Sequence, residues 1–130
     1  MNHVIDYYFA PVSPWAYLGH ARVGAIAKAA GATVRVRPVH MNAVFAVSGG
    51  LPLARRPASK PAVLSELLAE CGLPAELAVL AQQEAVDARL DENTRLAIEG
   101  QVFGSPSYVL DGEIFWGQDR LEFLREALAA

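Results

Sequence analysis

The sequence predicts one α/β domain in which a β-α-β half and a β-β-α half are joined by a helical segment. Three observations support this fold class. Two strand patterns flank a helix within the first forty residues, a hairpin signal lies near residue 111, and amphipathic helical patterns fill residues 61–100 and the end of the chain. The chain has 130 residues, of which 53% are hydrophobic, and this is the size and composition of one domain with a packed core.

The first half reads as a strand, a helix and a second strand. Residues 3–9 are β-branched or aromatic around a single acid, Asp6, as in a strand buried on both faces. Small and aliphatic residues recur at helical spacing over 14–30, and Gly31 is a typical helix stop. Residues 33–39 form the second strand pattern, in which Val34 and Val36 point one way and Arg35 and Arg37 the other. A β-α-β unit of this length predicts parallel strands with a right-handed crossover.

The start of the first helix is the first candidate site. Ser13 stands at the N-cap position, and Pro14 fits the first helical position, where no N–H group is needed. A side chain at this point faces the free N–H groups and the positive end of the helix dipole. Such a place favours a thiolate or another anion.

The middle of the chain changes character. Residues 40–60 contain glycines and prolines that interrupt regular patterns, so we expect a loop there. Helices are predicted over 61–72, from Pro74 over a short stretch, and over 84–98. The domain therefore divides into 1–60 (the β-α-β half with its loop), 61–100 (the helices) and 101–130 (the β-β-α half).

The tail predicts a hairpin and a final helix. Two apolar runs flank Asp111-Gly112, which is a strong turn signal, and we expect Phe115 and Trp116 in the hairpin core. The last helix carries leucines on one face at positions 121, 124 and 128.

Composition excludes several classes of function. The net charge is −3 and the pI about 5.5, and no basic patch suited to nucleic acid is visible. No apolar run approaches the length of a membrane span, and no signal-peptide pattern is visible, so we expect a cytoplasmic protein without membrane contact. Cys71 is the one cysteine, which excludes an intrachain disulfide, and the histidines show no metal-ligand spacing.

A β-α-β half joined to a β-β-α half, with a proline just before the third strand, is the thioredoxin arrangement. Three stretches make the resemblance specific: Ser13–Leu18, Val102–Pro106 and Phe115–Leu121. They resemble motifs of the 2-hydroxychromene-2-carboxylate isomerases and of their relatives, the kappa-class glutathione transferases. The resemblance extends over nearly the whole chain.

The chain departs from this family in its middle. The segment 56–58 resembles the loop before the family's inserted helical domain, whereas 61–64 resembles a segment late in it. We interpret this as an internal loss of roughly seventy residues, which would remove much of the family's hydrophobic substrate pocket. By the family's spacing, Gly50 and Ser59 stand where an asparagine and a lysine near glutathione or substrate are expected, and Lys60 lies one residue late.

The resemblance implies a role for Ser13 with glutathione as cofactor. Disulfide oxidoreductases of this fold carry cysteines where this chain has Ser13 and Ala16, so dithiol redox chemistry is excluded. The family pattern implies that Ser13 donates a hydrogen bond to the thiolate of bound glutathione. The alternative is that Ser13 is an N-cap and nothing more.

The two C-terminal motifs imply the rest of the glutathione site. The Ser105–Pro106 peptide bond is expected to be cis, with the Ser105 backbone open to the cysteinyl part of glutathione; the alternative is an ordinary trans turn. Gln118 and Asp119 are implied to hold the γ-glutamyl end, with Asp119 pairing with its ammonium group. The alternative is that Asp119 only caps the final helix.

The resemblance implies a glutathione-dependent isomerase of an aromatic keto acid. The thiolate would add reversibly to the conjugated bond, and glutathione would be neither consumed nor oxidised. A non-catalytic thioredoxin-like module and a glutathione transferase are the alternatives. Apolar surface bared by the loss of the helical domain favours a homodimer in either case.

Overall fold

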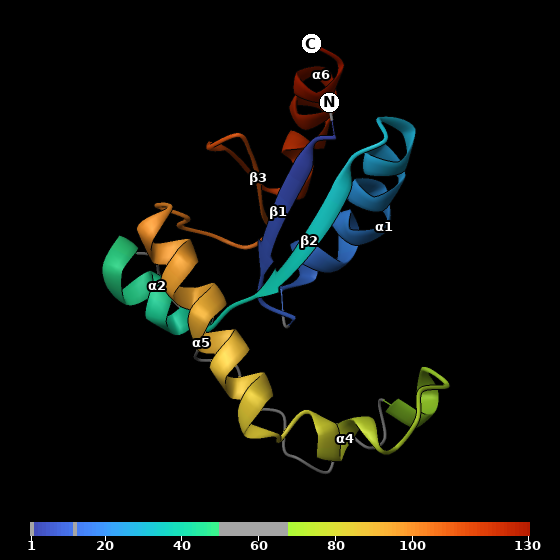
Figure 1. Ribbon diagram of the computed structural model, residues 1–130, viewed down its shortest axis with the longest axis vertical. Coiled ribbons are helices and arrows are strands. Elements are labelled where there is room, and N and C mark those ends of the chain that lie inside the picture. The colour runs from blue at the N-terminus through green and yellow to red at the C-terminus, as the bar shows by residue number, and fades with distance from the viewer. Residues whose placement is uncertain (1, 12, 50–67) are drawn as a thin grey trace.

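A four-stranded mixed sheet lies at the centre of the protein (Figure 1), in a computed structural model that describes residues 2–11, 13–49 and 68–130. The strands are β1 (Val4–Phe9), β2 (Thr33–Pro38), β3 (Ser107–Leu110) and β4 (Glu113–Trp116), in the spatial order β2-β1-β3-β4. β1 pairs parallel with β2 and antiparallel with β3, and β4 runs antiparallel to β3. The predicted thioredoxin-like fold class is confirmed.

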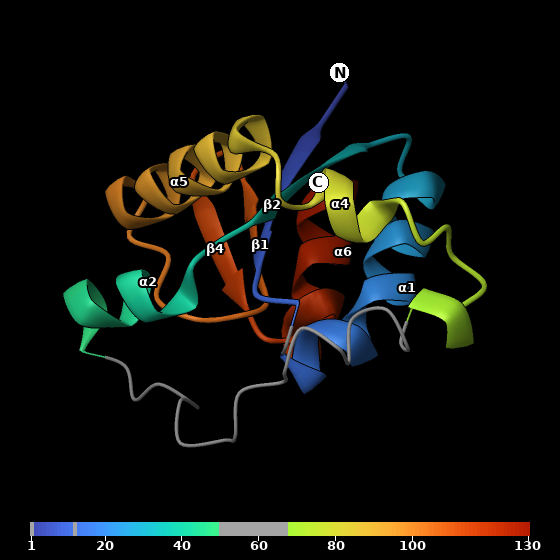
Figure 2. The same ribbon diagram turned by 90° about the horizontal axis from the view of Figure 1, so that it is seen from below.

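One face of the sheet is covered by α1 (Pro14–Ala29) and α6 (Leu121–Ala129), as Figure 2 shows. The predicted leucine face of α6 is buried, and Leu121 and Leu124 are fully inaccessible. They pack with Val23 of α1 and with Ile5 and Tyr7 of β1 in one hydrophobic cluster. This cluster fixes α1 against β1 and therefore fixes where α1 begins.

The other face is covered by α5 (Glu84–Glu99) and α2 (Met41–Ser48), on the opposite side of the sheet in Figure 2. The loop expected over residues 40–60 is wrong for 41–48. This segment is a helix because Val44 packs with Tyr8, Ala97 and Val102 in a second cluster. Gly49, with a φ of 78°, ends it, so the glycine signal marked a helix end and not a loop interior.

The helices predicted after residue 60 lie partly outside the described residues, as do Gly50, Ser59 and Lys60. Residues 68–70 are helical and Gly72 follows with a φ of 66°, while α4 (Leu77–Leu80) begins later than the expected start at Pro74. Figure 1 shows α4 extending away from the sheet. No helix in the described ranges has the length and apolar character needed to cross a bilayer.

The predicted hairpin turn is present. Asp111 and Gly112 have φ values of 50° and 88°, the left-handed pair that a two-residue hairpin turn requires. Phe115 is buried, as expected, but Trp116 is 52% exposed. Its expected place in the core is wrong because Trp116 points to the other face of β4, where its ring stacks edge-on against Phe103 outside the core.

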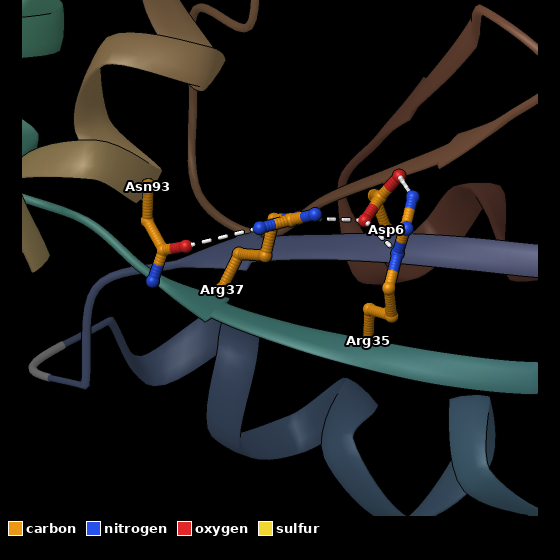
Figure 3. A network of polar contacts seen from close by, with 4 residues as sticks. All are labelled: Asp6, Arg35, Arg37 and Asn93. Carbon is orange, nitrogen blue, oxygen red and sulfur yellow. Dashed lines mark hydrogen bonds and ion pairs between the residues drawn. The ribbon is translucent and has the colours of Figure 1, made fainter. Parts of the chain in front are cut away.

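A polar network ties the sheet to α5 (Figure 3). Arg35 and Arg37 of β2 both donate hydrogen bonds to the carboxylate of Asp6 on β1, at 2.6 to 2.8 Å, and Arg37 also donates to the side chain of Asn93 on α5, at 3.2 Å. Burial by itself raises the pKa of Asp6, but these hydrogen bonds and the nearby positive charges outweigh burial, so the net pKa lies below its ordinary value.

This network predicts a specific loss of stability in acid. A carboxyl whose pKa is lower in the folded chain stabilises the fold above its unfolded pKa, and that contribution disappears as the pH falls through the carboxyl range. Asp6→Asn should therefore show a shallower fall of the unfolding free energy on acidification than the wild type. Denaturant titrations at neutral and acidic pH would measure this, and parallel curves for the two proteins would contradict it.

Candidate active site

The first turn of α1 holds Ser13 at its N-cap, as predicted. Its φ and ψ of −76° and 118° are extended, and its Oγ accepts a hydrogen bond from the Ala16 N–H at 3.3 Å. The backbone N–H of Ser13 donates to the carbonyl of Ala10 at 2.9 Å, which closes the turn between β1 and α1. The structure records no acceptor for the N–H of Trp15 in the described ranges, so this donor stays open at the positive end of the helix.

Ser105 lies directly against this turn. The hydroxyl of Ser13 donates to the carbonyl of Ser105 at 3.3 Å, and the N–H of Ala10 donates to the hydroxyl of Ser105 at 2.9 Å. The Ser105–Pro106 peptide bond is cis, as expected, and Pro106 is fully buried. The structure therefore brings together the two motifs that the sequence separates by more than ninety residues.

Gln118 and Asp119 lie in a 3-10 helix, η1 (Gln118–Arg120), that leads into α6. The N–H of Gly117 donates to the carbonyl of Pro106 at 2.9 Å, so η1 begins beside the same loop. Arg22 of α1 donates to the side-chain oxygen of Gln118 at 2.9 Å and to its carbonyl at 3.2 Å.

Asp119 is exposed and forms no ion pair within the described residues. The alternative role of Asp119 as cap of the last helix is wrong, because Asp119 is inside η1 and the position before α6 belongs to Arg120. Its carboxylate therefore remains available to a cation.

Gly19 sets how closely η1 approaches α1. A Cβ atom at this position would lie 2.5 Å from the hydroxyl oxygen of Tyr108 and 2.9 Å from Cβ of Gln118. The hydroxyl of Tyr108 is buried and has no hydrogen-bond partner in the described part of the chain. The absence of a side chain at Gly19 thus allows Gln118 to reach the second turn of α1.

The side chain of Tyr7, on β1, contacts the first turn of α1. Its hydroxyl donates to the carbonyl of Ala16 at 3.3 Å, and its ring stacks on Tyr108 with a centroid separation of 5.1 Å. Burial raises the pKa of Tyr7 to about 12, so the phenol keeps its proton at neutral pH and remains a donor.

A groove of about 720 Å³ begins at the turn that precedes Ser13. Its walls come from Ala10 and Pro11 in this turn, from the end of β2, from the start of α2 and from one face of α5. Apolar side chains dominate the walls, and His40 and Arg89 are the two cationic or titratable members. Ser13 and Ser105 do not line the groove, although Ala10 and Pro11 of the neighbouring turn do.

Sequence reasoning missed this groove and Arg89 in particular. The signal was present in the spacing of Ala85, Arg89 and Asn93, which puts one arginine on the same helical face as Val86 and Leu90. The sequence shows which residues share this face of α5. It does not show what lies across from them, because the rest of the groove comes from β2, α2 and the β1–α1 turn.

The start of α1 is an electrostatically favourable place for an anion. The Ser13 hydroxyl, the open N–H of Trp15 and the helix dipole all favour negative charge at this point. The exposed carboxylate of Asp119 suits an ammonium group. Within the described residues, no group of three or more His, Cys, Asp or Glu side chains is arranged to hold a metal ion.

Comparison with known proteins identifies the family. Residues 53–129, more than half of the chain, match the model of the DsbA-like thioredoxin domain. The chain belongs to the DsbA-like thioredoxin domain family. At the start of α1 the chain carries Ser13 and Ala16, neither of which contains sulfur.

Two curated relatives of this DsbA-like chain are named 2-hydroxychromene-2-carboxylate isomerase. The proteins from Pseudomonas sp. (strain C18) and Pseudomonas putida are each 37% identical to it over 89 residues, which is 68% of the chain. The matched region is 41% and 43% of the two relatives, so the chain spans less than half of their length.

Solved structures agree on the fold of this DsbA-like domain. A 2-hydroxychromene-2-carboxylate isomerase structure superposes with a TM-score of 0.74 at 23% identity, covering 97% of this chain and 94% of that one. Pseudomonas aeruginosa DsbA superposes with a TM-score of 0.65 at 14% identity, covering 98% and 83%. At these identities the matches establish the architecture alone.

The close approach at Gly19 predicts opposite effects for two glycines of α1. Gly19→Ala should lower the unfolding free energy by about 1–3 kcal/mol, because the new methyl group overlaps Tyr108 and Gln118. Gly24→Ala is the matched control: no atom lies within 4 Å of its Cβ position, and the change should stabilise the helix by about 0.5–1 kcal/mol. Urea denaturation of both variants measures the difference, and similar values would contradict the packing at Gly19.

Proposed function

We propose that this chain is a glutathione-dependent isomerase of the 2-hydroxychromene-2-carboxylate type, acting on an aromatic keto acid. The contact that carries this proposal is the hydrogen bond between Ser13 and Ser105, beside an apolar groove. The two relatives that are 37% identical support the reaction class. When bound, glutathione would supply a thiolate that adds reversibly to a conjugated double bond of the substrate, so that this bond can rotate before the thiol leaves.

Ser13 would orient and stabilise the thiolate. Its hydroxyl donates to the Ser105 carbonyl over 3.3 Å, which is long for a hydroxyl donor, so the proton is weakly held there. An anion is a better acceptor than a peptide carbonyl, and the helix dipole adds to its attraction. Rotation of the hydroxyl toward the ligand therefore exchanges a weak hydrogen bond for a charge-assisted one.

The remaining residues would bind the peptide part of glutathione. Asp119 would pair with the ammonium of the γ-glutamyl group, and Gln118, held in place by Arg22, would contact the same end. The backbone of Ser105 would take the cysteinyl part. The groove would hold the aromatic substrate next to this site, and proximity would account for much of the rate enhancement.

Two substitutions at Ser13 separate a capping role from thiolate binding. Ala at an N-cap costs about 0.5–2 kcal/mol of stability, whereas Gly costs only a few tenths. Ser13→Ala and Ser13→Gly should therefore differ in stability, yet both should weaken glutathione binding by about tenfold or more, because both lack the hydroxyl. Calorimetric titration with glutathione measures the affinities, and a spectrophotometric isomerisation assay measures the activity.

Three results would overturn this proposal. If the wild type shows no heat of binding at millimolar glutathione, the enzyme assignment fails and a non-catalytic thioredoxin-like module remains. If Ser13→Gly binds as tightly as the wild type, the hydroxyl is only a cap. Activity with an unrelated electrophile and none in the isomerisation assay would instead indicate a glutathione transferase.

We also propose that the chain forms a homodimer through the segment around α4. Leu77 and Leu80 lie three residues apart on α4, and Leu73 precedes this helix. The side chains of Leu73, Leu77 and Leu80 are 48%, 38% and 45% exposed. No buried residue occurs in α4, so this segment packs poorly on its own domain. A second copy of the chain would cover these side chains and remove apolar surface from water.

Sedimentation velocity tests this association. We expect the wild type to sediment as a dimer and the double variant Leu77→Asp with Leu80→Asp to sediment as a monomer. Val79→Asp is the matched control. Val79 is 70% exposed in the same helical turn, but its side chain points away from Leu77 and Leu80. A monomeric wild type, or equal dissociation by the control, would contradict the proposed interface.

A further inference from the structure

Arg89 is a cation in the groove to which the proposed reaction assigns no role. It lies on α5, and its neighbours on the same face are Ala85, Val86, Leu90 and Asn93, all of which also line the groove. The opposite wall includes Val36 and Pro38 of β2. A guanidinium group therefore stands among apolar side chains at the edge of a cavity.

The other arginines of the described ranges all have partners. Hydrogen bonds, ion pairs or a ring contact engage the side chains of Arg22, Arg35, Arg37, Arg95, Arg120 and Arg125. For Arg89 the structure records none in the described ranges. Its donors are therefore free to bind an anionic ligand.

No described residue that lines the groove supplies a negative charge to pair with Arg89. His40 lines the groove and its Nε2 lies 3.3 Å from the carboxylate of Asp91, so that acid is engaged by the histidine. Asn42 and Asn93 add only neutral amides, and the amide oxygen of Asn93 already accepts from Arg37. No carboxylate belongs to the described lining of the groove.

We infer that Arg89 selects substrates that carry a carboxylate, holding this group at the edge of the groove while the apolar walls take the aromatic ring. A guanidinium binds a carboxylate through two parallel hydrogen bonds, which orients a flat ligand as well as attracting it. The apolar walls next to it offer an aromatic ring a surface to bury beside this cation. The inference rests on the proposed function only for the reaction that follows binding.

Binding of two probe molecules tests this inference without glutathione. Cinnamate is a planar aromatic carboxylate, and cinnamamide is its neutral counterpart of nearly the same shape. We expect the wild type to prefer cinnamate, and Arg89→Gln to bind cinnamate about tenfold or more weakly, because a hydrogen bond to a charged group is lost. Cinnamamide binding should be the same in both proteins, so the preference for the anion disappears.

Arg95→Gln is the matched control. It removes the same charge from the same helix, but Arg95 is engaged by Glu92 and Glu99 outside the groove. Its cinnamate affinity should equal that of the wild type. Arg89→Lys keeps the charge without the planar fork and should fall between the wild type and Arg89→Gln.

The inference would be overturned by no cinnamate binding by the wild type, by equal losses in Arg89→Gln and Arg95→Gln, or by equal losses of cinnamate and cinnamamide in Arg89→Gln. Glutathione itself carries carboxylates, so its affinity must be measured as well. This measurement shows whether Arg89 binds a carboxylate of the substrate or one of glutathione. We expect the glutathione affinity to be unchanged in Arg89→Gln, and a loss confined to glutathione would also overturn the inference. Failure of glutathione to bind any variant would affect only the proposed function.

Discussion

Two hydrogen bonds join the turn after β1 to the loop before β3, and the geometry of the candidate site depends on them. The hydroxyl of Ser13 reaches the Ser105 carbonyl, and the hydroxyl of Ser105 receives the N–H of Ala10. The pairing of the strands brings these two segments together. Tyr8 pairs with Ser107 in the antiparallel register, so the chain leaving β1 and the chain entering β3 occupy the same end of the sheet. The two serines then satisfy backbone groups that burial would otherwise leave unpaired.

The proposed anion site at the start of α1 depends on how this helix is held. A helix N-terminus attracts anions only if its direction is fixed and its open donors are accessible. Packing of Val23 and Ala27 against the sheet fixes the direction of α1, and the hydroxyl of Tyr7 contacts its first turn. The groove begins on the other side of the turn, at Ala10 and Pro11. A ligand that spans both places would touch the helix start with one end and apolar walls with the other.

Features that depend on residues close together in the sequence could be predicted. The N-cap at Ser13, the left-handed turn at Asp111 and Gly112, and the leucine face of α6 are all local signals, and the structure agrees with each. The cis bond before Pro106 was predicted from the family resemblance, since local sequence alone favours trans.

Features that depend on distant partners were missed. α2 has too few residues to be stable by itself and exists because Val44 meets Ala97 and Val102, so its sequence read as a loop. The exposure of Trp116 follows from which face of β4 is covered, which the alternation of residues does not state. The groove needs β2, α2 and α5 together, so Arg89 could be assigned to a helix face but not to a cavity.

The single proton of the Ser13 hydroxyl limits what this site can do. The oxygen already accepts from Ala16, and its proton points to Ser105, so the side chain has one donor to offer and no base within its recorded contacts. A serine without a base is a poor nucleophile but a good donor to an existing anion. Cys71 is exposed and far along the chain from α1, and Ser13 and Ala16 carry no sulfur. Any thiolate chemistry at the start of α1 therefore requires a sulfur brought by a ligand, and the free acid at Asp119 is suited to the amine of such a ligand.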